Sequence, residues 1–165
     1  MKNYYFIKTC FILFAAILAE IPVLGISVEV NKANSFVNYC TLSKNKAYDE
    51  IILTGNITLS DDILLTKHLT IRSDGQRRTI TVANARQIQV NPGYTLTLTN
   101  IVFDGNNYSR RNEGLFYLNP SSDTNKIARL ELQKGTTIRN ITVTTTANAD
   151  HAVIHAKKGS RIIID

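Results

Sequence analysis

Leu69-Thr70-Ile71 decides the fold, because the same strand unit returns as Leu96-Thr97-Leu98, Leu130-Glu131-Leu132 and Ile162-Ile163-Ile164. Each unit has apolar residues at its first and third positions, which a β-strand places on one face. Successive units begin 27, 34 and 32 residues apart, as the differences 96−69, 130−96 and 162−130 show. This spacing is too long for hairpins and suits one circuit of a coiled sheet. The sequence therefore predicts an all-β fold, a parallel β-helix solenoid.

Other short strands fall between these units in a repeated order. Ile88-Gln89-Val90 is followed by Asn-Pro-Gly, and Phe116-Tyr117-Leu118 is followed by Asn-Pro and a polar insertion at residues 121–126. A third copy runs from Val153-Ile154-His155 through Lys-Gly to the last unit. Pro and Gly favour turns because of their backbone preferences, so we expect a corner at each site. The insertion is then a loop that leaves the coil.

Alternation also predicts which side chains form the core and which face outward. The threonines that alternate with the apolar positions are expected outside, where β-branching alone explains their frequency. An ordered threonine face that matches ice or a glycan is the alternative. The following residues are expected to point inward: Leu69, Ile71, Ile80, Val82, Leu96, Leu98, Ile101, Phe103, Leu130, Leu132, Ile141, Val143, Ile162 and Ile164.

Asn100 and Asn140 each precede an apolar run, Ile-Val-Phe and Ile-Thr-Val. Asparagine tolerates the left-handed conformation and suits a tight corner. If the two occupy equivalent corners of neighbouring coils, their amides stack as a ladder. Two independent loop asparagines are the alternative.

Residues 1–25 have the features of a signal peptide. Lys2 and Lys8 precede an apolar run at residues 11–18, and Gly25 ends a small-residue segment suited to cleavage. The run is short for a membrane span, although an uncleaved anchor is the alternative. We therefore expect a secreted or cell-surface protein with no stable membrane span after cleavage.

The mature chain divides into an N-terminal segment, residues 26–48, and β-helix coils over residues 49–165. Residues 34–47 place Phe36, Tyr39 and Cys40 at helical spacing, which predicts a helix that caps the first coil. Cys40 is the only cysteine after the signal peptide, and we expect it to be a buried structural residue. The apolar strand at the end of the chain indicates a solenoid truncated at its C-terminus.

Residues 49–82 and the segment GYTLTLTNIVFDG, residues 93–105, resemble the pectate-lyase-like β-helix adhesin domains of bacterial surface proteins. The resemblance extends over roughly residues 34–165. It implies a right-handed parallel β-helix that is displayed outside the cell and used for adhesion.

Acidic residues and histidines give no catalytic or metal signature. Enzymes of this fold group carboxylates on a strand face, whereas the acids here stand alone, apart from Asp61-Asp62 in a turn. Asp104 opens a turn with too few oxygens for calcium. His151 and His155 are four apart in a predicted strand, about 13 Å, which excludes a shared metal. We expect no enzyme activity, catalytic residue, cofactor or metal.

The net charge is +6, and its clusters suggest an acidic partner. Arg77, Arg78, Arg110 and Arg111 are the candidate residues for binding acidic glycans, with a solvated basic face as the alternative. The absence of tryptophan and of interleaved aromatic and basic residues argues against nucleic acid. The expected partner is a host or environmental polysaccharide or a cell-surface glycan.

These observations favour an exported, non-catalytic surface adhesion or glycan-binding module. Two alternatives remain. The first alternative is the N-terminal part of a carbohydrate-active enzyme of the same fold, a polysaccharide lyase or hydrolase. The second alternative is a structural spacer.

Overall fold

The computed structural model describes residue 25 to residue 41 and residues 48–107, 109–111, 114–144 and 152–165. In these residues the protein is mostly β, with parallel sheets and one short helix. The predicted signal peptide lies outside the described residues except for Gly25. Among the described helices, none combines the length and the apolar character that crossing a bilayer requires.

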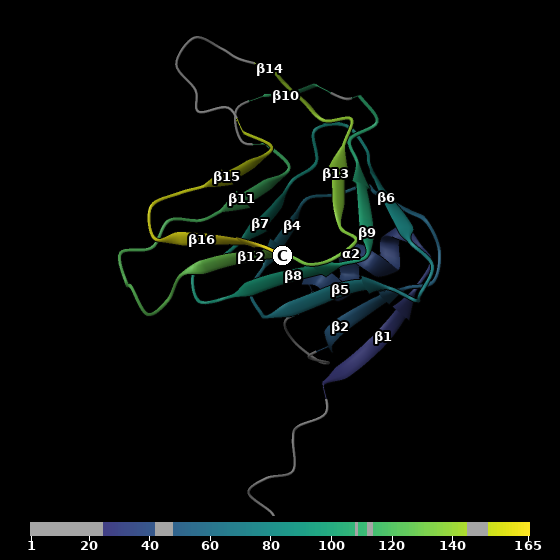
Figure 1. Ribbon diagram of the computed structural model, residues 1–165, viewed down its shortest axis with the longest axis horizontal. Coiled ribbons are helices and arrows are strands. Elements are labelled where there is room, and N and C mark those ends of the chain that lie inside the picture. Colours follow the sequence, from purple (N-terminus) through teal and green to yellow (C-terminus); the bar gives the residue numbers. More distant parts are fainter. Residues whose placement is uncertain (1–24, 42–47, 108, 112–113, 145–151) are drawn as a thin grey trace, which may run out of the picture.

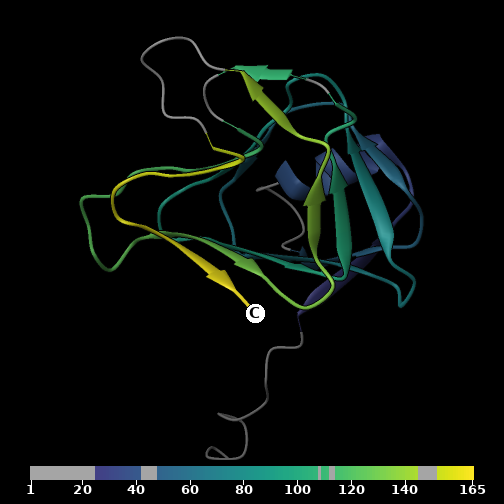
Figure 2. The same cartoon turned by 45° about the horizontal axis from the view of Figure 1, so that its top comes forward.

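Three parallel sheets make up the molecule, and they form its three sides in Figure 1 and Figure 2. The first sheet contains β1 (Ile26–Val30), β2 (Tyr48–Leu53), β5 (Leu69–Ser73), β8 (Thr95–Thr99), β12 (Ala128–Leu132) and β16 (Ser160–Ile164). The second sheet contains β3 (Ile57–Leu59), β6 (Arg78–Val82), β9 (Ile101–Asp104) and β13 (Thr137–Arg139). The third sheet contains β4 (Ile63–Leu65), β7 (Ile88–Val90), β11 (Phe116–Leu118) and β15 (Ile154–Ala156). A small fourth sheet pairs β10 (Ser109–Arg111) with β14 (Thr142–Thr144).

The chain passes through the first, second and third sheets in turn, so that each passage adds one strand to each of them. The repeated strand units are therefore neighbours in register. Leu69 lies opposite Leu96, Leu96 opposite Leu130, and Leu130 opposite Ile162. The all-β fold, the parallel pairing and the short helix agree with the sequence prediction.

Alternate residues of these strands point into a single apolar core. Nine of the fourteen residues predicted to point inward are fully buried, from Leu69 to Leu130 in chain order. Ile162 and Ile164 pair in register with Leu130 and Leu132 and so share the inward face, but they remain 36% and 73% exposed. Both lie on β16, the last strand of the first sheet in the described residues, where no further described strand covers them. Leu132, Ile141 and Val143 are only half-buried near this end.

Of the two alternatives for Asn100 and Asn140, the structure favours independent loop asparagines, although both adopt the left-handed conformation, with φ of 54° and 55°. Phe103 of β9 pairs with Ile138 of β13, so Asn100 precedes its strand whereas Asn140 follows its strand. The asparagine ladder lies elsewhere. The amide of Asn119 donates to Asn91 Oδ1 at 2.9 Å, at the corners that follow β11 and β7.

One end of the stack is covered by α2 (Ala33–Thr41), on the far side in Figure 1. The helix contacts β2, β3 and β4, one strand from each of the three main sheets, and it buries Phe36 and Cys40. Burial raises the pKa of the Cys40 thiol well above its ordinary value. The Lys67 ammonium joins the helix to the sheets by donating to Tyr39 O at 2.9 Å and to Tyr48 O at 3.0 Å. The predicted cap is thus observed for its first part, while residues 42–47 lie outside the described residues.

Sequence analysis did not predict β1, which pairs with β2 and extends the first sheet beyond the first three-strand passage. The signal was present, because residues 26–30 read Ile-Ser-Val-Glu-Val, an alternation typical of a half-buried strand.

Candidate functional site

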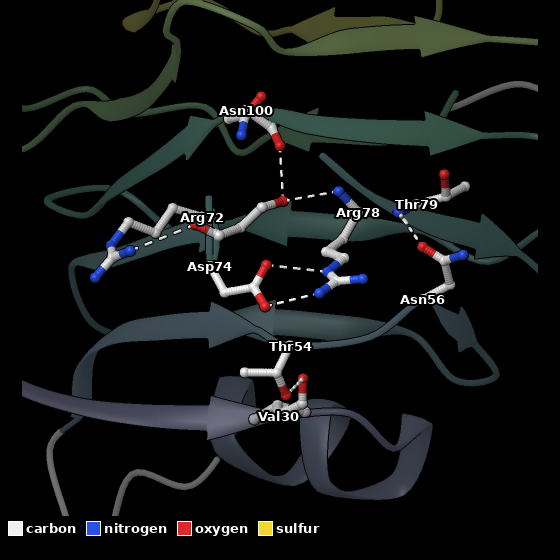
Figure 3. Close-up of polar contacts among 9 residues, drawn as sticks. Val30, Thr54, Asn56, Arg72, Asp74, Arg78, Thr79 and Asn100 are labelled. Atoms are coloured by element: carbon white, nitrogen blue, oxygen red, sulfur yellow. Dashed lines mark hydrogen bonds and ion pairs between the residues drawn. The ribbon is translucent and has the colours of Figure 1, made fainter. Parts of the chain in front are cut away.

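Arg77 and Arg78 lie at the corner between β5 and β6. Figure 3 shows the Arg78 guanidinium facing the carboxylate of Asp74, with Nη2 to Oδ2 at 2.7 Å and Nε to Oδ1 at 3.0 Å. This hydrogen-bonded pair lowers the pKa of Asp74. Arg77 is exposed, and its guanidinium donates to the hydroxyl of Thr137. Of these two arginines, Arg77 therefore presents its charge without an ion pair to a described acid.

Arg110 and Arg111 belong to β10, and their side chains lie outside what the structure describes. Arg78 pairs with Ile101 at the start of β9, whereas β10 follows the end of that strand. Figure 1 shows β10 and β14 at the top, apart from the corner between β5 and β6. The structure therefore does not bring the two predicted arginine pairs together in one site.

Asp104, considered above as a calcium ligand, accepts hydrogen bonds from three neighbouring protein groups. Its carboxylate accepts from Asn106 N at 2.9 Å, Arg139 Nε at 2.9 Å and Asn140 Nδ2 at 3.1 Å. The Asn106 N–H and then the Asn140 amide lower the pKa of Asp104. In the described part of the chain, no group of three His, Cys, Asp or Glu residues is arranged to hold a metal ion. The geometry gives Asp104 a structural role at the corner after β9.

Replacing Asp104 with asparagine is expected to destabilise the protein at neutral pH by about 1.5 kcal/mol, because charge-assisted hydrogen bonds are lost. The folded-state pKa is depressed, so this stabilisation is present above the unfolded-state pKa of about 3.9 and is lost as the pH falls through the folded value. Urea unfolding of both proteins between pH 7 and pH 2 measures the difference. It should shrink below about pH 4. A difference that is constant with pH would contradict the assignment.

A polar face covers the outer side of the first sheet. Its side chains line up in register across the strands and bond to one another. Arg72 Nε donates to Glu50 Oε1 at 2.7 Å, and Thr97 Oγ1 donates to Glu131 Oε2 at 3.2 Å. Thr99 Oγ1 likewise donates to Gln133 Oε1 at 2.6 Å. The predicted outward threonines are thus part of an ordered surface of hydroxyl, amide and charged groups.

A depression of about 220 Å³ lies at the edge of this polar face, where the third sheet turns into the first. The insertion predicted as a loop forms one wall and is tied to the preceding turn by Gly93 N donating to Ile127 O at 3.1 Å. The backbone of Arg129 donates to Tyr94 O at 3.0 Å. The lining residues are His68, Gly93, Thr95, Asn125, Ile127 and Arg129. We call this feature the corner depression.

One arginine lines the corner depression, and further basic side chains lie beside it. Arg129 faces outward from β12 and lies opposite Arg161 of β16 in register. In the part of the chain that the structure describes, neither arginine makes an ion pair. The nearest outward acid on β12, Glu131, accepts from Thr97 instead. Exposed Lys126 and Lys158 flank the same corner and add further positive charge.

Sequence reasoning missed this site because it looked for charges adjacent in the chain. Arg129 and Arg161 are 32 residues apart (161−129) and become neighbours only through strand pairing. A usable signal existed, because each precedes an apolar residue of the repeated unit, at Leu130 and at Ile162. His68 is exposed, and its ring contacts Tyr94 edge to face at 5.8 Å.

Comparison of the chain with protein-family models, curated proteins and solved structures finds no match. The resemblance to pectate-lyase-like adhesin domains therefore stays a prediction.

Proposed function

We propose that the protein is an exported, non-catalytic adhesion or glycan-binding module, built as a right-handed parallel β-helix related to pectate-lyase-like adhesin domains. The chain's passage through three parallel sheets and the helix at one end support this architecture. The single observation that carries the binding function is the polar face of the first sheet together with the corner depression.

The polar face suits a repeating ligand for geometric reasons. Its outward side chains recur from strand to strand, and neighbouring strands lie about 4.8 Å apart. Thr97 and Thr99 are already oriented by Glu131 and Gln133. Side chains that are ordered before binding lose less conformational entropy when a ligand arrives. A polymer of hydroxyl-bearing units is the ligand class that such a surface fits best.

A binding role is favoured over catalysis because two carboxylates of this face, those of Glu50 and Glu131, already bond to neighbours. Glu50 accepts from Arg72, and Glu131 accepts from Thr97. General acid–base chemistry on glycosides uses two carboxyl groups that flank one bond. Glu50 and Glu131 stand on strands separated by β5 and β8, so they do not form such a pair.

A glycan array read at two salt concentrations, beside a product assay on polygalacturonate, tests the proposal. We expect binding to acidic polysaccharides that fades above about 0.15 M salt, because exposed charges are then screened. We expect no release of reducing ends or unsaturated products, with or without calcium. Turnover above the blank would favour the enzyme alternative, and silence in both assays would favour a spacer.

A further inference from the structure

We infer that the corner depression is the point where the protein holds an acidic sugar unit, with Arg129 binding its carboxylate or sulfate group. This inference rests on the proposed glycan-binding function and locates it at residues that the sequence analysis did not select. It replaces the dispersed arginine pairs by one site on the first sheet.

Arg129 has the chemistry for the anion. Its side chain is half-buried in the wall of the depression, and no described acid neutralises it. A planar guanidinium matches a carboxylate or sulfate through two parallel hydrogen bonds. Partial removal from water strengthens such a pair relative to one on a fully exposed arginine. Arg78 differs, because its guanidinium already binds the Asp74 carboxylate.

The remaining lining supplies neutral groups for a sugar ring. The Thr95 hydroxyl and the Asn125 amide offer donors and acceptors that suit ring hydroxyls. The rings of His68 and Tyr94 add aromatic surface beside them. Gly93, with φ of 87°, lines the depression with its backbone alone, so no side chain obstructs the ligand there. One cation among several neutral groups fits a sugar with a single acidic substituent better than a bare inorganic anion.

Arg161 extends the site in a definite direction. It lies opposite Arg129 on the neighbouring strand, whose backbone is about 4.8 Å away, so a second cation projects from the same face. A polymer with an acidic group on successive units therefore meets both arginines if it runs across the strands of the first sheet. Arg129 is the primary contact because it lines the depression, whereas Arg161 is exposed beside it.

Binding of carboxymethyl-dextran, dextran sulfate and neutral dextran by the full chain tests the inference, since the three polymers share one backbone. We expect Arg129→Gln to weaken binding of both acidic polymers about tenfold, and Arg129→Gln/Arg161→Gln to weaken it further. Arg77→Gln is the matched control, because it removes the same charge from an exposed corner outside the depression. It should change affinity less than twofold. Unchanged melting temperatures will establish that the variants fold.

Four outcomes would overturn the inference. If Arg77→Gln weakens binding as much as Arg129→Gln, or if Arg129→Gln has no effect, the site is wrong while glycan binding stands. If Arg129→Gln weakens binding of neutral dextran equally, Arg129 does not recognise the anion. If the wild-type protein binds no polymer here and none on the glycan array, the proposed function fails together with the site.

Discussion

Phe103→Ala is expected to destabilise the protein by about 3 to 5 kcal/mol, the usual cost of removing a buried phenylalanine. Phe103 is completely buried on β9, and its ring packs edge to face against Phe116 of β11 at 5.1 Å. The substitution leaves a cavity between two sheets. Strands β6 and β13 hold β9 on both sides, so the surroundings are poorly able to collapse into the space.

Urea unfolding monitored by circular dichroism measures this effect. Leu64→Ala is the matched control, because Leu64 is a large apolar residue of β4 that faces outward and is 45% exposed. Its free energy of unfolding should stay within about 0.5 kcal/mol of the wild-type value. A Phe103→Ala variant as stable as Leu64→Ala would show that β9 does not carry the core.

The strands of the first sheet were predictable from the sequence because their signal is local. Alternation identifies the inward positions without any long-range information, and the similar units then align with one another. Leu69, Leu96 and Leu130 pair exactly as their shared pattern indicates. The last unit has the same pattern, but Ile164 is exposed, because no described strand lies beyond β16 in the first sheet.

The second sheet was harder because turn length, and not strand pattern, decides its register. Leu98 pairs with Leu132, an offset of 34 residues, whereas Phe103 pairs with Ile138, an offset of 35. One extra residue therefore lies in the turn near Gly135, whose φ of 83° accommodates it. The resemblance of the segments after Asn100 and Asn140 pointed instead to an offset of 40 (140−100). The extra residue leaves no mark in the apolar pattern.

The candidate site escaped prediction for a related reason. Residues adjacent in a strand point to opposite faces, so a basic pair in the sequence does not make a basic surface. Residues in register on neighbouring parallel strands do share a face, as Arg129 and Arg161 do. In a protein of this kind, charges separated by one passage through the sheets are the ones to compare. That comparison requires the register, which the sequence specifies only for the first sheet.

Gly105→Ala is expected to cost about 3 kcal/mol, at the upper end of the usual range for overpacking. Gly105 follows β9, and its N–H donates to Arg139 O at 2.9 Å. A Cβ atom added there would lie 2.4 Å from Asn140 O and 2.5 Å from Ile141 Cγ1. The first of these is a backbone atom, so a side-chain rotation does not relieve the contact. Strands β9 and β13 must separate at this corner.

Gly55→Ala is the control, because its added Cβ meets only atoms of Asn31, the nearest being Cβ at 3.3 Å, and a small shift suffices. We expect that variant to remain within about 1 kcal/mol of wild type. Urea unfolding gives both values. Separation of the two strands also pulls Arg139 and Asn140 away from Asp104, so Gly105→Ala should lose the acid-dependent stabilisation assigned to that carboxylate. If Gly105→Ala were destabilised but retained that dependence below about pH 4, the strain would lie elsewhere and the tight corner after β9 would not be its cause.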